Sequence, residues 1–374
     1  MGVSGAWLHH PGTQAVLGML GPGAYLVGGC VRNDLMGLPV VDIDIATDLV
    51  PEQVLQRAQE AGFRTVLTGI DHGTVTVIAH GLPHEVTTFR RDVETDGRHA
   101  VVRFCTDICE DARRRDFTMN ALYADASGAL IDPLNGLPDL LARRVRFIEE
   151  AAQRIAEDHL RILRFFRFQA WYGDPEQGID SEGLAACAAA VAGIVQLSAE
   201  RITAELVKLL CAPDPAPAVA AMAQSGVLNA VLPGADARSL PLLVHLETTA
   251  PRPMRRLAIL GGDTTGLCLS RAQRRALDQL RAEMGGANPP GALAQQYGAD
   301  VARQICELRA AQFEQPLPVD LEHELTKGAN AIFPVKAADL MPLFQGPALG
   351  AELLRLKELW IASGFTLTRD DLLK

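Results

Sequence analysis

Residues 25–47, YLVGGCVRNDLMGLPVVDIDIAT, combine a double glycine, an arginine and two closely spaced aspartates. The apolar start predicts a strand that ends at the glycines, and VRNDLMG predicts the beginning of a helix. VDIDIAT (41–47) alternates in polarity and is rich in β-branched residues, which predicts a second strand. Because side chains alternate between the two faces of a strand, Asp42 and Asp44 are expected to point the same way.

Two carboxylates on one strand face repel each other unless a positive group lies between them. Mg²⁺ prefers hard oxygen ligands, and such a pair could activate a hydroxyl and neutralise a triphosphate. Gly28 and Gly29 would let the backbone approach a phosphate at the start of the helix, where Arg32 could add a charge-assisted contact. A solvated edge strand is the alternative for the aspartates, and an ordinary tight turn is the alternative for the glycines.

The composition is typical of a globular protein, and its basic residues are unevenly distributed along the chain. The 374 residues are 48% hydrophobic, and the formal net charge is −10. No apolar run reaches the roughly 18 residues of a membrane span. Nearly all basic residues are arginines, and the first lysine is Lys208. The arginine clusters could therefore form local positive surfaces for a nucleic acid on an acidic protein.

The seven cysteines are scattered, and the N-terminal residues do not resemble a secretory signal. These features predict reduced thiols and a cytoplasmic protein. CxxxC at Cys105 and Cys109 lacks a second ligand pair, so buried thiols are expected there rather than zinc.

The pattern along the chain predicts a mixed α/β part to about residue 150 and an almost wholly helical part after it. Strands are expected in FRTVLTG, TVTVIAH, EVTTFRR, VVRF and VRFI, a hairpin in LYADASGALIDP, and a loop in DVETDGRHA (92–100). Helices are expected in PEQVLQRAQEAG, in LSAERITAELVKLL and in one long run from Ala151 to Tyr172. His72 is expected to have a structural role in a loop.

The run GGCVRNDLMGLPVVDID resembles the signature of the class II tRNA nucleotidyltransferases, which belong to the polymerase-β-like superfamily. Further matches follow in the family's order: TGIDHGTVTV, EVTTFR, RRDFTMNAL, DPLNGLPDL, EDHLRILRFFRF and LSAERITAEL. Together they cover about residues 24–210, and the C-terminal part matches only loosely. The family usually has Asp directly after the arginine of GGxVR, whereas this chain has Asn33 followed by Asp34.

This resemblance implies an α+β fold, in which a nucleotidyltransferase head with a mixed sheet precedes an all-α neck, body and tail. The expected boundaries are 1–147 for the catalytic head, 148–212 for the neck that selects the nucleotide, 213–290 for the body and 291–374 for the tail. Body and tail would bind tRNA through its shape and phosphates. Arginines of RPMRRLA (252–258) and SRAQRRALDQLR could serve there, or could form ordinary charged helix faces.

The implied reaction is the addition of C, C and A to the 3′ end of tRNA from CTP and ATP, with Mg²⁺ as cofactor. Asp42 and Asp44 would bind the metal, and Glu85 would be a third catalytic carboxylate or else a residue on a solvated strand face. The implied partners are tRNA, ATP and CTP, with no DNA, membrane or obligate protein partner. The residues implied to bind the nucleotide are Gly28, Gly29, Arg32, Arg115, Asp158, Arg161, Arg164 and Arg167.

Base selection is expected from Asp158 and Arg161, which are neighbours at i and i+3 if the helix is continuous. A carboxylate accepts from the exocyclic amine that C and A share, and a guanidinium donates to the ring nitrogen or carbonyl. A surface ion pair is the alternative. Arg164 and Arg167 turn progressively away from Asp158, so they fit phosphate or ribose contacts better. Asp116 is expected to anchor the arginines or to cap the helix that follows it.

Three alternatives concern the activity. A bacterial poly(A) polymerase shares the head, but TGIDHGTVTV resembles the CCA-adding version. The second alternative is an enzyme that adds only CC or only A. CC-only enzymes tend to lack a flexible loop, and RDVETDGRHAVVRF fills the place of this loop, which favours an enzyme able to add A. A binding module without chemistry is the third, and the intact aspartates and glycines disfavour it. The sequence has no adjacent His-Asp pair, so an appended phosphohydrolase domain of the HD type is not expected.

Overall fold

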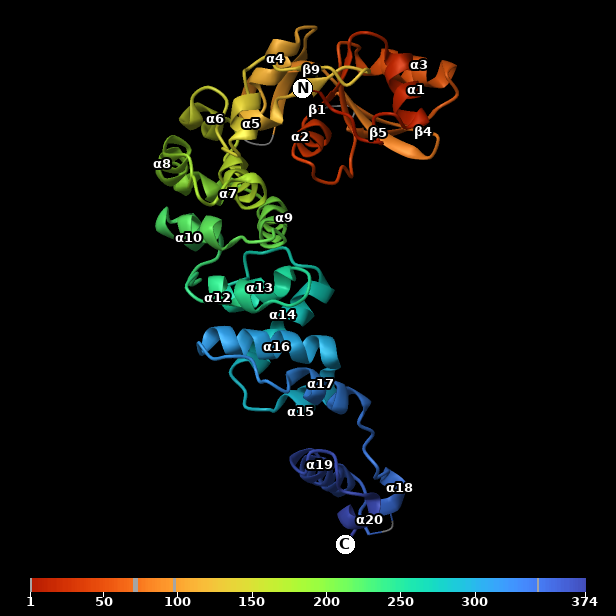
Figure 1. Ribbon diagram of the computed structural model, residues 1–374, viewed down its shortest axis with the longest axis vertical. Coiled ribbons are helices and arrows are strands. Elements are labelled where there is room, and N and C mark those ends of the chain that lie inside the picture. The colour runs from red at the N-terminus through yellow and green to blue at the C-terminus, as the bar shows by residue number, and fades with distance from the viewer. Residues whose placement is uncertain (1, 70–72, 97–98, 342) are drawn as a thin grey trace. The chain divides into compact units, whose positions relative to one another are not determined.

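The computed structural model describes residues 2–69, 73–96, 99–341 and 343–374 (Figure 1). The chain divides into two compact units: Met1–Pro233 with Thr264–Leu267, and Gly234–Asp263 with Cys268–Lys374. The finer division into head, neck, body and tail stays a prediction.

A seven-stranded mixed sheet organises the beginning of the first unit, with strand order β3-β4-β5-β2-β1-β8-β9. Only β2 and β5 pair in parallel among these strands, and the other neighbours are antiparallel. Strands β6 and β7 form a separate antiparallel pair. The bounds are β1 Ala24–Val27, β2 Asp44–Thr47, β3 Arg64–Gly69, β4 Thr74–Ala79, β5 Leu82–Thr88, β6 Arg90–Asp96, β7 His99–Phe104, β8 Tyr123–Ala124 and β9 Leu130–Ile131. This is the α+β head that the sequence predicts.

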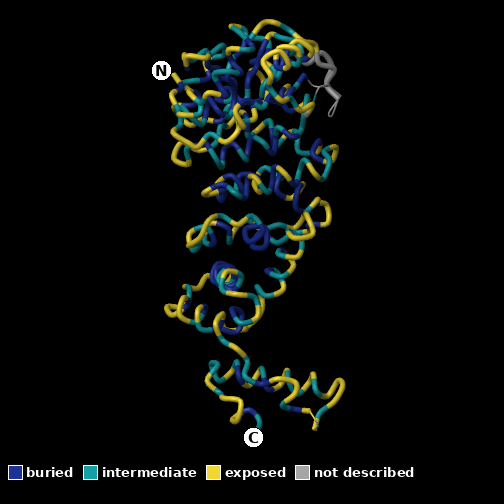
Figure 2. The backbone as a smooth tube through the Cα atoms, turned by 90° about the vertical axis from the view of Figure 1, so that its right-hand side faces the viewer, coloured by how far each residue is buried: buried dark blue, intermediate teal, exposed yellow. Residues whose placement is uncertain are grey.

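Apolar residues of the sheet and of its connecting segments form the core of the head. One cluster joins Val27 of β1 and Ala46 of β2 to Phe89 and Tyr123, all at most 3% exposed. Buried segments run through this region in the backbone tube (Figure 2). The helices and 3-10 turns of the head are α1 Pro11–Leu20, α2 Gly29–Leu35, α3 Pro51–Glu60, α4 Ile108–Arg113, η2 Thr118–Asn120 and α5 Leu137–Leu141.

The remainder of the first unit is helical in the described residues, apart from an isolated bridge between Phe117 and Phe147. Phe117, Phe165 and Phe168 pack ring against ring, with centroids 4.7 to 6.3 Å from Phe117. This aromatic cluster attaches α7 to the head. The elements are α6 Ala151–Glu157, α7 Leu160–Tyr172, α8 Ser181–Ala189, η3 Val191–Gln196, α9 Ala199–Leu210, α10 Ala216–Gln224 and α11 Val227–Val231.

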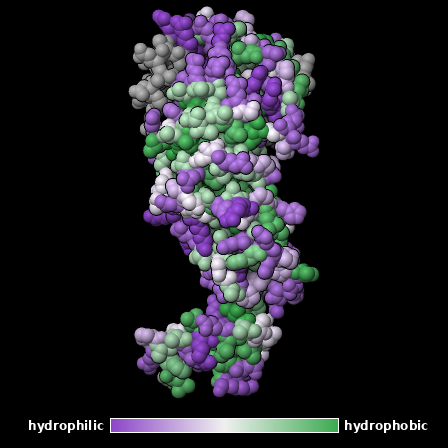
Figure 3. Space-filling model, turned by 90° about the vertical axis from the view of Figure 1, so that its left-hand side faces the viewer, coloured by the Kyte–Doolittle hydropathy of each residue, from purple (hydrophilic) through white to green (hydrophobic). Residues whose placement is uncertain are grey.

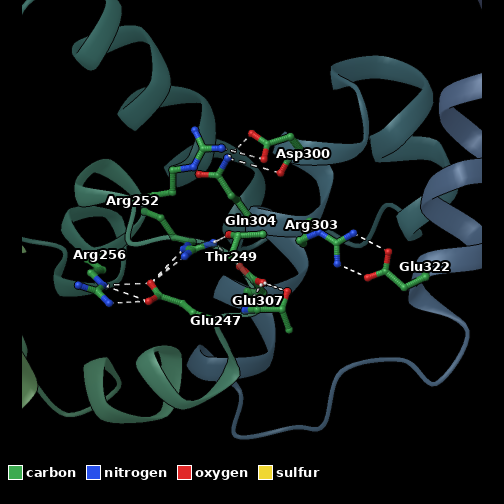
Figure 4. Close-up of polar contacts among 11 residues, drawn as sticks. Glu247, Thr249, Arg252, Arg256, Asp300, Arg303, Gln304, Glu307 and Glu322 are labelled. Atoms are coloured by element: carbon green, nitrogen blue, oxygen red, sulfur yellow. Dashed lines mark hydrogen bonds and ion pairs between the residues drawn. The ribbon is translucent and has the colours of Figure 1, made fainter. Parts of the chain in front are cut away.

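The second unit is also built from helices, and it buries a charged cluster. The guanidinium groups of Arg255 and Arg256 pair with Glu247, and Arg255 also pairs with Glu307 at 2.5 Å. All four side chains are at most 5% exposed, and the pairing of Arg256 with Glu247 is visible in Figure 4. The helices are α12 Leu240–Leu246, α13 Pro253–Leu260, α14 Arg271–Met284, α15 Pro290–Tyr297, α16 Ala299–Gln312, α17 Leu321–Asn330, α18 Ala337–Leu340, α19 Pro347–Ala362 and α20 Arg369–Leu372.

The structure corrects several expectations about local structure. The strand expected over 41–47 begins only at Asp44, and VRFI contributes a single bridge instead of a strand. The segment 92–100, expected as a loop, is largely the β6–β7 ribbon. The long helix expected over 151–172 is two helices, α6 and α7.

The expected tRNA-binding role of the RPMRRLA arginines is wrong for two of its three members. Arg255 and Arg256 are 0% and 1% exposed, because α13 turns them into the carboxylate cluster of the second unit. Arg252 remains half exposed and pairs with Asp300 at 3.0 Å.

No helix in the described part of the chain is both long and apolar enough to cross a membrane. On the face seen in Figure 3, hydrophilic and hydrophobic residues are interspersed over both units. His72, for which a loop role is expected, lies outside the described residues.

Candidate active site

Two carboxylates meet where β2 and β5 run side by side. Asp44 is the register partner of Glu85, and the Glu85 N–H donates to the carbonyl of Ile43 at 2.9 Å. Partners in adjacent strands point to the same face of a sheet, so both side chains lie on one side. Asp42 lies in the segment just before β2 and is exposed. Glu85 thus joins Asp44 from the neighbouring strand, and the charge of Asp42 also acts on Asp44, so the expected Asp42–Asp44 pair stays a prediction to which the structure adds Glu85.

The environment of Asp44 is unusually negative for a carboxylate. Burial, and after it the charge of the neighbouring Glu85, raise the pKa of Asp44 to about 6, although Arg115 opposes the rise. Asp42 contributes in the same direction as Glu85. Adjacent oxygen donors with uncompensated charge suit a divalent cation that keeps other positions for water and phosphates. Within the described residues, no group of three or more His, Cys, Asp or Glu side chains is arranged to hold a metal ion by itself.

The double glycine forms the turn between β1 and α2. Gly28 has φ +69°, a conformation that residues with a Cβ rarely adopt, and it precedes the first residue of α2, Gly29. The glycine turn is thus required by the backbone at Gly28.

Arg32 is buried in α2 and links three elements. Its guanidinium donates to Asn120 at 2.6 Å, to Asn33 at 2.9 Å and to the Tyr172 hydroxyl at 2.9 Å. It also lies 4.0 Å from the centroid of the Tyr172 ring, and burial lowers its pKa. Asn33 thereby accepts from the neighbouring arginine, while Asp34 accepts from Ser4, Gly5 and Trp7. At the position after the GGxVR arginine, where the family usually has Asp, this chain has Asn33, which accepts a hydrogen bond from Arg32.

Asp111 of α4 holds the two arginines that follow directly after this helix. Its carboxylate accepts from Arg114 and Arg115, each at 2.9 Å, and from the Tyr123 hydroxyl at 2.7 Å. Burial alone would raise the pKa of Asp111, but Arg115 and Arg114 hold it well below its usual range. The sequence reasoning missed Asp111, although its i,i+3 and i,i+4 spacing to these arginines was a usable signal.

Asp116 connects the same segment to α7. Its Oδ1 accepts from the Phe117 N–H at 3.0 Å and from Asn120, and its Oδ2 accepts from Arg164 Nε at 2.7 Å. Asp116 therefore anchors an arginine, but this arginine is Arg164 of α7 and not one of the arginines that precede Asp116. The alternative of a helix cap is wrong, because the N-cap of η2 is Phe117 and no side chain caps it.

Asp158 lies at the break between α6 and α7, in an extended conformation with φ −154° and ψ 105°. It is therefore not the helical i,i+3 partner of Arg161, and each of the two side chains is paired elsewhere. Asp158 pairs with Arg201 at 2.6 Å, whereas Arg161 pairs with Glu157 and donates to the carbonyl of Arg114 at 2.9 Å. The alternative of an Asp158–Arg161 surface ion pair is wrong because the helix does not continue through Asp158, whereas their expected role in base selection stays a prediction.

Arg167 is the last of the three arginines of α7 that are predicted to bind the nucleotide. It pairs with the buried Glu205 of α9 at 2.5 Å, and its guanidinium lies 4.8 Å from the centroid of the Phe168 ring. Arg164 and Arg167 thus leave the helix in different directions, as their spacing predicts.

A cavity of about 350 Å³ gathers many of these side chains. Of the predicted nucleotide-binding residues it brings together Arg115, Asp158, Arg161 and Arg164, whereas Gly28, Gly29, Arg32 and Arg167 do not line it. It adds residues that the sequence reasoning did not select for the site. The full lining is Arg90, Arg114, Arg115, Asp116, Asn120, Asp158, Leu160, Arg161, Arg164 and Arg201. A cavity so rich in arginine suits a polyanion such as a nucleoside triphosphate.

Comparison with known proteins agrees with this geometry. A family model described as the poly A polymerase head domain matches residues 24–146, and one described as a probable RNA and SrmB-binding site of polymerase A matches 178–238. The mouse mitochondrial CCA tRNA nucleotidyltransferase 1 is 34% identical over 93% of this chain and 85% of its own length. The chain belongs to the CCA tRNA nucleotidyltransferase family.

Bacterial members of the CCA tRNA nucleotidyltransferase family match in sequence over part of this chain and in fold over nearly the whole chain. The CCA-adding enzyme of Geobacillus stearothermophilus is 39% identical over 60% of this chain and 55% of its own length. A crystal structure of the Bacillus stearothermophilus CCA-adding enzyme in complex with CTP has a TM-score of 0.74 and 28% identity, covering 95% of this chain and 94% of that one. The Thermotoga maritima enzyme complexed with tRNA shares the fold, with a TM-score of 0.71 at 20% identity over 96% of this chain and 93% of that one.

Proposed function

We infer that this chain adds C, C and A to the 3′ end of tRNA, using CTP and ATP and releasing pyrophosphate without a nucleic-acid template. The observation that carries the inference is the juxtaposition of the Asp44–Glu85 pair with an arginine-lined cavity, in a chain that matches CCA tRNA nucleotidyltransferases over most of its length. Arg115 relates the two features, since it lines the cavity and its charge acts on Asp44.

In this proposal the carboxylates of Asp44, Asp42 and Glu85 hold Mg²⁺ beside the end of the tRNA. Bound there, Mg²⁺ would lower the pKa of the attacking 3′ hydroxyl and neutralise charge on the triphosphate. Asp44 and Glu85 supply ligands from rigid strands, and Asp42 supplies one from a less constrained segment. Arg115 and Arg164 orient the triphosphate or ribose, and their carboxylate partners, Asp111 and Asp116, keep the two guanidinium groups in place.

The proposed roles of the remaining predicted residues follow from their positions. The Gly28–Gly29 turn gives the triphosphate access to the backbone, and Arg32 braces that turn against α7 while contributing positive charge. Arg167 orients the nucleotide indirectly, because it lies outside the cavity lining. Asp158 accepts from the exocyclic amine of C or A, and Arg161 donates to the ring edge.

The curated relatives reported above are named for CCA addition, which favours full addition over polyadenylation or partial addition. A cytoplasmic site of action accompanies this proposal, and it is supported by the free thiols of all seven cysteines.

The test uses tRNA transcripts ending before CCA, after C and after CC, each incubated with Mg²⁺ and single labelled nucleotides. We expect two C additions followed by one A and then arrest. Long A tails that also form on unrelated RNA would show a poly(A) polymerase instead. Addition of C alone or of A alone would show half of a divided activity.

A further inference from the structure

The carboxylate of Asp158 is held by two anchors at the break between α6 and α7. Its Oδ1 accepts from the Leu160 N–H at 3.0 Å, and its Oδ2 accepts from Arg201 Nη2 at 2.6 Å. Asp158 and Arg201 both line the 350 Å³ cavity. An ionised carboxylate has about four acceptor positions, so two remain for a ligand in the cavity.

Arg201 comes from α9, which does not belong to the break. α9 packs against α7 and buries Leu206, Leu209 and Leu210, so it forms a stable support behind the cavity. One helical turn after Arg201, Glu205 holds Arg167 of α7 at 2.5 Å. The same face of α9 thus holds Asp158 at one end of α7 and Arg167 farther along it.

The local backbone alone would not fix the orientation of the Asp158 carboxylate. Asp158 is extended, and its own carboxylate is restrained within the break only by the Leu160 N–H. A carboxylate with one neutral anchor can rotate about its side-chain bonds, whereas a second, charge-assisted hydrogen bond fixes its orientation. A base with an exocyclic amine could donate to a carboxylate fixed at this position. A base with a carbonyl at the same place would be repelled by the carboxylate.

We propose that Arg201 is a positioning residue for base selection, which fixes the Asp158 carboxylate toward the cavity without contacting the base itself. This inference rests on the proposed function. Loss of Arg201 should let the carboxylate turn away from the carbonyl of U or G, so that discrimination falls more than turnover does.

The experiment measures kcat and KM for CTP and UTP on a tRNA transcript ending before CCA. For Arg201→Ala we expect the ratio of kcat/KM between CTP and UTP to fall by about tenfold or more, with the loss mainly in KM for CTP. Arg201→Lys should recover part of the discrimination, because the observed contact uses a single N–H donor. Lys208→Ala is the matched control, since it removes a positive charge from an exposed position of the same helix.

A double-mutant cycle separates positioning from a general structural effect. In an Asp158→Ala background, Arg201→Ala should cause little further loss of discrimination if Arg201 acts through Asp158. Wild-type discrimination in Arg201→Ala, or an equal further loss in the double variant, would overturn the inference. If Arg201→Ala does not fold, Arg201→Gln decides by the same criteria. A wild-type protein that adds neither C nor A would instead refute the proposed function.

Discussion

At the scale of single residues, Asp44 and Glu85 are register partners in adjacent strands, and their negative charges act on each other. Burial and the charge of Glu85 make the Asp44 anion costly in the absence of a cation, as its raised pKa of about 6 shows. The Asp44 anion therefore lowers the stability of the fold when no metal is bound, and such a local loss of stability is common at functional sites.

Replacing Asp44 by Asn tests this interpretation. We expect nucleotide incorporation to fall by at least ~100-fold, because a ligand and its charge are lost. The melting temperature of the variant without metal should equal or exceed that of the wild type, since a repulsive charge is removed. Mg²⁺ should raise the melting temperature of the wild type but not of the variant. Equal stabilisation of both proteins by Mg²⁺ would contradict the assignment.

Asp116 predicts a pH dependence of stability. Burial alone would raise its pKa, but Arg164 and the hydrogen bonds to it lower the pKa to about 2. A depressed carboxyl pKa stabilises the fold above the unfolded value near 4, and this contribution of about 2 kcal/mol disappears as the pH falls from 4 toward 2. Urea unfolding from pH 5 to pH 2.5 should show the loss, and Asp116→Asn should reduce it. An unchanged pH slope in the variant would show that other groups dominate.

At the scale of elements, the break between α6 and α7 is maintained by a close approach from η3. A Cβ added to Gly193 would lie 1.9 Å from the imidazole of His159, the residue directly after Asp158. The absence of a side chain at Gly193 therefore lets η3 support the break from which Asp158 faces the cavity.

Gly193→Ala should therefore displace His159 and disturb the break. We expect a loss of about 1–3 kcal/mol in the free energy of unfolding, typical of overpacking, together with weaker discrimination between CTP and UTP. Gly178→Ala is a poor control because Gly178 has φ +76°, whereas a Cβ at Gly350 would meet open space. Gly350→Ala should leave the discrimination unchanged and should raise the free energy of unfolding by about 0.5–1 kcal/mol, because Gly350 lies inside α19 and alanine has the higher helix propensity. Unaltered stability in Gly193→Ala would mean that η3 moves aside at little cost.

At the scale of the whole molecule, the two compact units differ in the charged groups that they contain. The carboxylate pair and the arginine-lined cavity lie in the first unit, whereas the second unit is organised around Arg255, Glu247 and Glu307. Near its surface, Arg303 pairs with Glu322 in the same close-up view of the second unit (Figure 4).

Arg255→Met would leave Glu247 with only Arg256 and would deprive the buried Glu307 of its ion-pair partner. Removing one member of a buried ion pair costs about 3–5 kcal/mol, so the second unit should unfold at lower urea concentration. CTP affinity, measured by calorimetry, should stay unchanged because the proposed nucleotide site lies in the first unit. A parallel loss of CTP affinity would show that the two units are energetically coupled.

The sequence by itself determined the α+β head, the helical remainder and the family. Strand alternation, the double glycine and Pro-initiated helices are local signals, so β1, β2, β5, α2 and α3 could be predicted from short segments. The sequence motifs selected four of the ten residues that line the cavity, namely Arg115, Asp158, Arg161 and Arg164.

Only the tertiary structure decided which residues pair with which. The register between β2 and β5 placed Glu85 beside Asp44. Because the helix breaks after α6, Asp158 pairs with Arg201, and Arg161 pairs with Glu157. The tertiary structure also buried Arg255 and Arg256, which the sequence presented as surface charges. Long-range pairing depends on how helices and strands pack, and a local pattern of residue types carries no information about the partner on another element.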